Sequence, residues 1–467
     1  MLQTLEDIQA TAATLEARYA SKLHVDRLLS RQLVSFQANK HKPGYRWFKY
    51  KEAFSEGLVN YILDRVGLTA GTILDPFAGS GTALFAARDR GLNALGIELL
   101  PVGGEIINAR KLVQGVGRVA IREALDRWAT QQPWREFADI QPFHHLRITQ
   151  GAFPPETENA LGRYLAACAT EPDEIATVLR FAAICVLEDI SYTRKDGQYL
   201  RWDYRSGRQQ GSPPFDKGNI LPFDSAIVQK IDEIRADLGP SGYLPGFFED
   251  SQQKGEIEVR QGSCLNILPT LPTASIDGII TSPPYINRYD YTRTYALELA
   301  MLGIGEAEIK ALRQKMVSCT VENRAKPELP MLFAPGVYAA AQVAFDSQQT
   351  LSTILHYLEL QKAERILNNA GIPRMVRNYF WEMALIIFEC ARILRPNAKF
   401  VMVNDNVRYS GVTIPVDLIL SDFATHAGFS VEAIWVLPTE KGNSSQQMGE
   451  HGRQALRKCV YVWRKEP

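Results

Sequence analysis

The sequence predicts an α/β fold, in which helices cover a mostly parallel β-sheet. Two short apolar segments, 72–75 and 276–280, have the length and composition of strands in the interior of a sheet. The first is followed by a glycine-rich turn, a run of small residues with helical character at 83–90 and another strand-like segment at 93–98. This strand–helix–strand order is typical of a parallel sheet. Ligands of such sheets bind at the carboxyl ends of the strands, so the residues that follow each segment are candidate site residues.

The composition indicates an ordinary globular protein. The chain has 467 residues, of which 46% are hydrophobic, so it can form one large core or a few smaller ones. The 52 Lys and Arg residues balance the 52 Asp and Glu residues, so a nucleic-acid partner must be held by local basic patches rather than by overall charge. The six cysteines show no C-x-x-C pair and no metal-type spacing, which favours a reduced, cytoplasmic protein without a metal site. No signal pattern and no apolar run of about 18 residues is present, which predicts that the chain does not span a membrane.

The turn after the first strand is a candidate cofactor site. Glycines allow a tight turn and a close approach of the backbone to a ligand, and the next helix points its N-terminal amides toward the same place. The following strand ends on Glu98, about 20 residues later, where a carboxylate can accept hydrogen bonds from the ribose hydroxyls of a nucleotide-like cofactor. The alternative is an ordinary βα turn, since many such turns contain glycines. The candidate cofactor-binding residues are Asp75, Pro76, Phe77, Gly79, Ser80, Gly81, Thr82 and Glu98.

The segment 276–280 leads into a candidate reaction site. It is followed by Ser282, Pro283, Pro284 and Tyr285. The two prolines remove backbone donors and stop the strand, which leaves a rigid loop with an aromatic tip. The alternative is a strand that runs into a plain proline turn. The glycine-rich turn elsewhere in the chain favours the reaction site.

Asp-Pro-Phe-Ala-Gly-Ser-Gly-Thr at 75–82 and Thr-Ser-Pro-Pro-Tyr at 281–285 together resemble the two signature motifs of the amino-directed, S-adenosylmethionine-dependent DNA methyltransferases. The resemblance implies a class I methyltransferase fold, a Rossmann-like, seven-stranded, mostly parallel sheet, here with two insertions. It also implies S-adenosylmethionine as the cofactor. The auxiliary cofactor segment of that family corresponds to 41–63, which contains Tyr50. Its third strand corresponds to 257–265, where Ser263 would offer a polar group to the adenine of the cofactor.

The catalytic motif also bears on the target base. A serine before Pro-Pro-Tyr resembles the cytosine-N4 branch of the family, whereas an aspartate is commoner among adenine-N6 enzymes. Many cytosine-N4 enzymes have the catalytic motif first, unlike this chain, so the adenine-N6 activity stays open. In the mechanism that the resemblance implies, Ser282 and the Pro283 carbonyl accept the two hydrogens of the target amine, and Tyr285 stacks on the flipped base. This mechanism requires neither a covalent intermediate nor a metal.

The resemblance divides the chain into six segments. They are an N-terminal helical segment at 1–39, the first half of the core at 40–110, an insertion for target recognition at 111–255, the second half of the core with the catalytic loop at 256–302, a mostly helical insertion at 303–375 and the C-terminal part of the core at 376–467. Helices are predicted over 1–30, 55–66, 174–189 and 379–394. Further strands are predicted at 257–265, 399–403, 431–436 and 459–463, of which the last two pair as an antiparallel hairpin.

Two segments rich in arginine and aromatic residues are candidate DNA contacts. In 191–208, five cations and two acids leave a local charge of +3, and glycines give the segment a turn-rich, extended character. Such a surface suits phosphates and base edges, although a solvated hairpin is the alternative. The three tyrosines and two arginines just beyond the catalytic loop either stack on a displaced base and hold its phosphates or pack the loop. The candidate DNA-binding residues are Arg194, Lys195, Arg201, Arg205, Arg288 and Arg293.

The sequence therefore predicts a site-specific methyltransferase that transfers a methyl group from S-adenosylmethionine to the N4 amine of cytosine in double-stranded DNA, in a restriction-modification or defence context. The alternatives are an adenine-N6 DNA methyltransferase and an RNA methyltransferase that acts on the guanine N2 amine. A non-catalytic DNA-binding subunit is disfavoured, because Asp75, Glu98, Ser282 and Tyr285 are all present. A cognate restriction endonuclease is left open as a partner, as is the oligomeric state.

Overall fold

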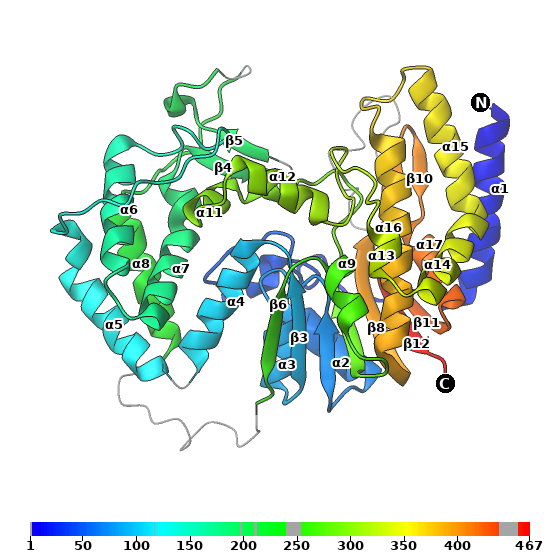
Figure 1. Cartoon of the computed structure of the whole chain (residues 1–467), viewed down its shortest axis with the longest axis horizontal. Coiled ribbons are helices and arrows are strands. Elements are labelled where there is room, and N and C mark those ends of the chain that lie inside the picture. The colour runs from blue at the N-terminus through cyan, green and yellow to red at the C-terminus, as the bar shows by residue number, and fades with distance from the viewer. Residues whose placement is uncertain (1, 116, 197–198, 210–212, 240–253, 439–455) are drawn as a thin grey trace.

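The computed structural model describes residues 2–115, 117–196, 199–209, 213–239, 254–438 and 456–467. A central β-sheet lies between two helical regions (Figure 1). On the left of the view, a lobe of helices is drawn in cyan and green. On the right, helices from the N-terminal segment and from the second half of the chain cover the sheet, and both chain ends lie on that side.

Eight strands form the central sheet of the described residues. In spatial order they are β1 (Leu23–Val25), β11 (Phe429–Val436), β12 (Lys458–Lys465), β8 (Leu394–Asp405), β7 (Ile276–Thr281), β2 (Thr72–Asp75), β3 (Asn93–Glu98) and β6 (Ile257–Gln261). β12 runs antiparallel to both of its neighbours, and the other neighbouring pairs are parallel. The strand order changes direction between β2 and β7. At such a switch point an open α/β sheet forms a crevice outside the carboxyl ends of its strands.

The other elements fall into three groups. Around the sheet lie α1 (Leu2–Tyr19), α2 (Glu56–Val66), α3 (Thr82–Asp89), α4 (Pro101–Gln114), α9 (Cys264–Ile267), α16 (Ile372–Ile393) and α17 (Val416–His426). The lobe contains α5 (Arg118–Gln131), α6 (Pro155–Cys168), α7 (Asp173–Ile190), α8 (Phe223–Asp237) and a hairpin of β4 (Thr193–Asp196) and β5 (Tyr199–Trp202). The remaining elements are α10 (Tyr291–Thr294), α11 (Ala296–Met301), α12 (Glu306–Lys315), α13 (Leu329–Leu332), α14 (Pro335–Ser347), α15 (Gln349–Ala363) and a hairpin of β9 (Val407–Tyr409) and β10 (Val412–Ile414). Short 3-10 turns lie at η1 (Ala20–Lys22), η2 (Phe36–Asn39), η3 (Pro133–Arg135), η4 (Tyr204–Ser206) and η5 (Leu268–Thr270).

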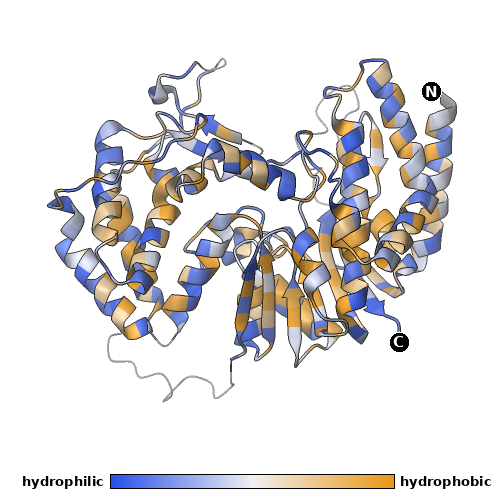
Figure 2. Ribbon diagram, in the orientation of Figure 1, coloured by the Kyte–Doolittle hydropathy of each residue, from blue (hydrophilic) through white to orange (hydrophobic). Residues whose placement is uncertain are grey.

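Side chains of the central strands alternate between two apolar cores. Ile280 and Val401 belong to the core that contains α2 and α3, whereas Ile279 and Phe400 belong to the core that contains α16 and α17. Because both faces are covered, these strands are continuous apolar runs in the sequence. Figure 2 shows the apolar colour along the strands and on the helix faces that meet them. A third core lies in the lobe and includes one face of α4.

Helix α2, which packs behind the glycine-rich turn, has clear signals at both ends. The Ser55 side chain accepts a hydrogen bond of 3.1 Å from the N–H of Leu58. This satisfies one of the backbone donors that every helix leaves free at its start. Gly67 follows the last turn with φ of 68°, a left-handed conformation that favours glycine.

The structure confirms the predicted fold class and adds one strand. The seven predicted strands are all present, and β1 is the eighth. β1 lies in the segment 1–30, which the sequence predicts to be helical, but α1 ends at Tyr19. Leu23–Val25 instead pairs in parallel with residues 434–436 of β11. This pairing covers the outer edge of the C-terminal hairpin, whose backbone groups would otherwise lack partners.

The proposed division into segments stays a prediction, and the elements lie within it as follows. The lobe falls within 111–255, of which 116, 197–198, 210–212 and 240–253 lie outside the described residues. The proposed boundary at 110 lies inside α4, and one face of α4 packs into the core of the lobe. Of the helices in 303–375, α12 lies above the sheet in Figure 1, and α14 and α15 pack against α16.

Candidate active site

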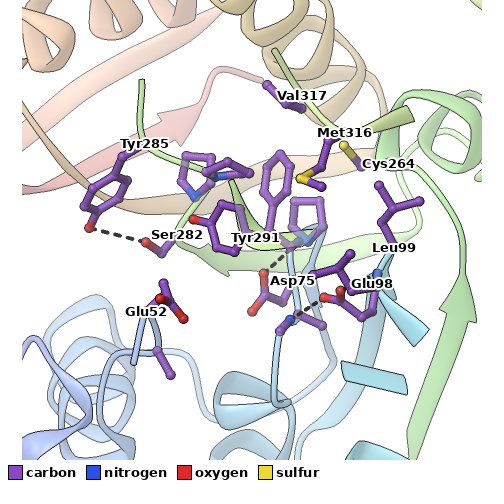
Figure 3. A pocket seen from close by; sticks show the side chains of 18 of the residues that line it. Glu52, Asp75, Glu98, Leu99, Cys264, Ser282, Tyr285, Tyr291, Met316 and Val317 are labelled. Carbon is purple, nitrogen blue, oxygen red and sulfur yellow. Dashed lines mark hydrogen bonds between the residues drawn. The ribbon is translucent and has the colours of Figure 1, made fainter. Parts of the chain in front are cut away.

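A cavity of about 450 Å³ opens at the carboxyl ends of β2, β3 and β7, at the switch point of the sheet. Several segments far apart in the sequence line it, namely 50–54, 75–80, 97–100, 262–264, 282–285 and 315–317. Figure 3 shows their side chains converging on one space. Cavities of about 300–1,000 Å³ are typical of small-molecule and cofactor sites.

Two glycines shape the turn after β2. Gly79 has φ of 54°, and its N–H donates a hydrogen bond of 2.6 Å to Oε2 of Glu98. Gly81 has φ of 77°, and a Cβ atom there would lie 2.8 Å from Cγ1 of Ile107. The left-handed backbone and the close contact both favour glycine. A hydrogen bond therefore joins the turn to the carboxylate at the end of the next strand.

Asp75 and Glu98 are buried carboxylates at the ends of neighbouring strands. Oδ1 of Asp75 accepts hydrogen bonds from the Thr281 hydroxyl (2.5 Å) and from the N–H of Phe77 (3.0 Å). Oε1 of Glu98 accepts one from the N–H of Leu100 (2.7 Å). Burial raises the pKa of each carboxyl to about 7, although these hydrogen bonds act to lower it. A positively charged ligand in the cavity would favour the ionised forms.

The loop after β7 presents Ser282 and Tyr285 to the same cavity (Figure 3). The Ser282 hydroxyl points toward the Tyr285 hydroxyl, with 3.5 Å between the oxygens. Burial raises the pKa of Tyr285, so its hydroxyl stays protonated. The far end of the loop is held by Tyr409, whose hydroxyl donates a hydrogen bond of 2.8 Å to the carbonyl of Ile286.

Glu52 and three tyrosines form a cluster that the sequence does not predict. The Glu52 carboxylate accepts hydrogen bonds from the hydroxyls of Tyr289 and Tyr295. The Tyr295 ring stacks on that of Tyr50, with centroids 4.9 Å apart. The segment before α2 is thus joined to the chain beyond the catalytic loop. The only signal in the sequence is that Glu52 directly follows a run of basic and aromatic residues that contains no acid.

Nearly all residues predicted for cofactor binding and for the reaction line this one cavity. They are Tyr50, Asp75, Pro76, Phe77, Gly79, Ser80, Thr82, Glu98, Ser263, Ser282, Pro283, Pro284 and Tyr285. Gly81 is the exception, because it lies behind the turn, near Phe85 and Ile107. The Ser263 hydroxyl donates a hydrogen bond of 2.8 Å to the carbonyl of Lys315, so only its lone pairs remain to accept a bond from a ligand.

Other lining residues are not predicted from the sequence. Leu99, Cys264, Met316 and Val317 form an apolar wall near Glu98 (Figure 3). Asp405 and Lys458 come from the carboxyl end of β8 and the start of β12. No local motif marks these positions, because the folding of distant segments brings them to the cavity.

The hairpin of β4 and β5 forms the predicted strand-and-loop surface. Arg194 and Arg201 are exposed. Their guanidinium carbons lie 5.6 Å and 4.1 Å from the centroid of the Phe215 ring. Arg201 also pairs with Asp196 at 3.3 Å. Both arginines are therefore positioned at the surface by an aromatic ring rather than by a buried acid.

Lys195 and Arg205 are placed differently from their neighbours. Lys195 is only 4% exposed, its ammonium pairs with the buried Glu298, and it lies 4.6 Å from the centroid of the Tyr295 ring. The prediction that Lys195 contacts a DNA phosphate is therefore wrong. Alternate residues of a strand face opposite sides, and Lys195 faces inward. Nε of Arg205 donates a hydrogen bond of 2.6 Å to the buried Asp203, so Arg205 stabilises the turn after β5.

Arg288 and Arg293 follow the catalytic loop. Arg288 has a left-handed φ of 65° and donates a hydrogen bond of 3.2 Å to Oδ1 of Asn368. Arg293 pairs with Asp290 and with Glu322, each at 3.2 Å. Since both arginines already have protein partners, their contacts with DNA stay predictions.

Among the helices of the described part of the chain, none is long and apolar enough to cross a membrane. No group of three or more His, Cys, Asp or Glu side chains in it is arranged to hold a metal ion.

Comparison with known proteins gives matches along almost the whole chain. Residues 19–107 match the N6/N4 family of DNA methylases. The chain is 52% identical over 462 residues to the type II methyltransferase M.AvaI of Nostoc sp., and it is equally similar to M.AvaI of Anabaena variabilis. Each of these alignments covers 99% of this chain and 94% of the relative. It is 39% identical over 488 residues to the type II methyltransferase M.BsoBI of Geobacillus stearothermophilus, which covers 97% of this chain and 91% of the relative.

Proposed function

This chain belongs to the N6/N4 family of DNA methylases and is a type II DNA methyltransferase, and on that premise we propose that it methylates the N4 amine of cytosine in double-stranded DNA with S-adenosylmethionine as the donor. One observation carries the proposal: Ser282 and Tyr285 face the same cavity as Asp75 and Glu98. The serine before Pro-Pro-Tyr, in place of an aspartate, favours cytosine over adenine.

The residues that line the cavity fit S-adenosylmethionine. Its volume of about 450 Å³ suits a nucleoside derivative of this size. Asp75 and Glu98 would accept hydrogen bonds from the polar groups of the cofactor, and Gly79 allows the backbone to come close. When bound, S-adenosylmethionine supplies an electrophilic methyl group on a positively charged sulfur.

Ser282 and Pro283 would activate the target amine by orienting it. The lone pair of an exocyclic amine is delocalised into the pyrimidine ring, which makes the nitrogen a poor nucleophile. The Ser282 oxygen and the Pro283 carbonyl accept the two amine hydrogens and draw the nitrogen toward tetrahedral geometry, which frees its lone pair. The Ser282 oxygen lies 3.5 Å from the Tyr285 oxygen, and a serine hydrogen directed there would leave the lone pairs of the serine available to the amine.

Tyr285 would hold the target base once it has left the duplex. Flipping a base out of the stack costs a few kcal/mol. Stacking on an aromatic ring restores about 1–3 kcal/mol of that cost. Tyr285 lines the cavity beside Ser282, so one loop would supply both the stacking surface and the acceptor for the amine.

The β4–β5 hairpin would contact the DNA around the flipped base. It packs beside α10, whose Tyr291 lines the cavity. Arg194 and Arg201 are exposed on it and are suited to phosphate contacts. Since the relatives are named as type II methyltransferases, we also propose a restriction-modification role, with an endonuclease that cuts the same sequence when it is unmethylated.

Nucleoside analysis tests the assignment. The purified protein is incubated with S-adenosylmethionine carrying an isotopically labelled methyl group and with unmethylated DNA, and the product is digested and weighed. We expect labelled N4-methylcytosine. N6-methyladenine would replace the proposed base, and label in structured RNA but not in DNA would overturn the proposed substrate. Methylation-sensitive sequencing of a host genome with and without the gene then gives the recognition sequence.

A further inference from the structure

Asp405 and Lys458 form an ion pair in the wall of the cavity. Nζ of Lys458 lies 2.5 Å from Oδ2 of Asp405, and the side chains are 31% and 20% exposed, respectively. Both residues line the cavity that contains Ser282 and Tyr285. The pair is therefore accessible to a ligand in the cavity without being freely solvated.

The sheet positions this pair beside the catalytic loop. β8 runs parallel to β7, with Met402 paired to Thr281, so the chain beyond Thr281 runs alongside the end of β8 at Asp405. β12 then places Lys458 directly opposite Asp405. After burial, the Asp405 carboxylate is the next largest cause of the raised pKa of Tyr285, which agrees with their proximity.

Among the described residues, three lysines line the cavity, and Lys458 is the one suited to contact the target base. The ammonium of Lys51 donates a hydrogen bond to the carbonyl of Lys195. Lys315 lies at the opposite end, where its carbonyl accepts the Ser263 hydroxyl. Only Lys458 is held on the side where Ser282 and Tyr285 lie.

We propose that Lys458, held by Asp405, donates a hydrogen bond to the O2 oxygen of the flipped cytosine and thereby selects cytosine over adenine. This inference rests on the proposed function. With the amine held at Ser282, the O2 oxygen lies at the other end of the pairing edge and needs a donor. Adenine has a C–H group at the corresponding place, so it would leave the ammonium with no acceptor besides Asp405. A site built around such a bond rejects a substrate that lacks it.

The carboxylate of Asp405 has a chemical reason to be present. An isolated cation at O2 would withdraw electrons from the ring and make the amine an even poorer nucleophile. Pairing with Asp405 offsets part of that charge, while the ammonium keeps hydrogens to donate. An ion pair is therefore better suited to this position than a lysine alone.

The test combines a change in the protein with a change in the base. Methylation is measured on duplexes whose target is either cytosine or 2-thiocytosine, in which a sulfur, a weaker acceptor, replaces O2. We expect wild-type protein to be about 10-fold slower on 2-thiocytosine. Lys458→Met should methylate cytosine about 10- to 100-fold more slowly than wild type, which is the range for a lost hydrogen bond to a charged group. Its rates on cytosine and on 2-thiocytosine should be nearly equal. Lys458→Arg should restore part of the rate and of the sensitivity to sulfur.

Lys399→Met is the matched control. Lys399 lies on the same strand as Asp405 and also pairs with an acid, Glu432, but outside the cavity. We expect it to behave as wild type on both bases. Thermal unfolding and calorimetric cofactor binding check the fold of each variant, and Asp405→Asn provides a second variant, which should lose the same discrimination.

Other results would contradict either the O2 contact alone or the proposed function as well. If the product is N4-methylcytosine and Lys458→Met is as sensitive to sulfur as wild type, the O2 contact is wrong and the proposed function stands. Weaker DNA binding with a flatter salt dependence would indicate a phosphate contact and overturn the inference in the same way. N6-methyladenine as the product would refute the proposed function itself, and the O2 contact with it.

Discussion

The hydroxyl of Thr281 donates a hydrogen bond of 2.5 Å to the carboxylate of Asp75, and both residues are buried. Thr281 is the last residue of β7 and Asp75 the last of β2, so the bond spans the switch point of the sheet. It joins the strand that precedes the glycine-rich turn to the strand that precedes the catalytic loop. Two motifs 206 positions apart in the chain therefore share one buried contact.

We expect Thr281→Val to weaken both the fold and the cofactor site. The substitution keeps the shape but leaves Asp75 with one partner fewer, a loss of about 1–3 kcal/mol in the free energy of unfolding. The Thr281 hydrogen bond also lowers the pKa of Asp75, so that pKa should rise further. Urea unfolding and calorimetric titration with S-adenosylmethionine measure the two effects. Thr130→Val, at an exposed threonine of α5, is the control and should change neither.

The pKa values of Asp75 and Glu98 predict that cofactor binding depends on pH. Both are about 7 in the folded protein, above the value of about 4 in an unfolded chain. Between these values the folded state binds more protons, so these groups make the free energy of unfolding fall as pH rises from about 4 to about 7. A positively charged cofactor favours the ionised carboxylates, so its affinity should rise as pH increases through about 7. Calorimetry in buffers of different ionisation enthalpy should detect proton release on binding.

Substitution of the two acids tests that assignment. Asp75→Asn and Glu98→Gln should flatten the pH profile, because they remove the groups that titrate. The alanine variants at both positions should lose cofactor affinity while DNA binding persists, each by the roughly 1.5–3 kcal/mol of a hydrogen bond to a charged group. Asp64→Asn, at an exposed acid of α2, should bind like wild type. Unchanged cofactor binding in all four site variants would show that the cofactor lies elsewhere.

Substitutions in the β4–β5 hairpin should affect the salt dependence of DNA binding differently at its exposed and buried positions. Arg201→Ala should weaken binding and reduce the log–log slope against salt by about 0.9, the effect of one lost phosphate contact. Lys195→Met should instead destabilise the fold without changing the slope, because it leaves Glu298 buried without its partner. Fluorescence anisotropy over a salt series measures the slope, with Arg135→Ala, at an exposed arginine of η3, as the control. A slope that stays the same in Arg201→Ala would favour the solvated hairpin.

The parts of the fold and site that the sequence predicts are those with local causes. Gly79 and Gly81 are required by the turn itself, and the central strands β7 and β8 contain apolar runs because both faces of the sheet are covered there. β1 was not predictable, since three residues become a strand only by pairing with β11. The sequence places Lys195 at the surface, because the charge of a segment does not reveal which face of a strand each residue occupies. Glu52 reaches the cavity only through tertiary contacts, so the acid-free run that precedes it does not reveal where its side chain lies.

The loop after β7 allows binding to be separated from catalysis. Ser282→Ala removes one acceptor for the amine hydrogens but keeps both prolines that shape the loop. The methylation rate should therefore fall by about 10²–10³, as for the loss of one preorganised contact to the transition state, while cofactor and DNA still bind.

Tyr285→Ala should be slower still, because it also removes a stacking surface worth about 1–3 kcal/mol. Tyr285→Phe and Tyr285→Trp should keep much of the activity, since an aromatic face remains to stack on the base. Single-turnover rates measured beside cofactor and DNA affinities distinguish a lost chemical step from lost binding. Because the Ser282 hydroxyl points toward that of Tyr285, the phenylalanine variant also tests whether this pairing orients the serine. Full activity of Ser282→Ala and Tyr285→Ala together would mean that the amine is activated by other groups in the cavity.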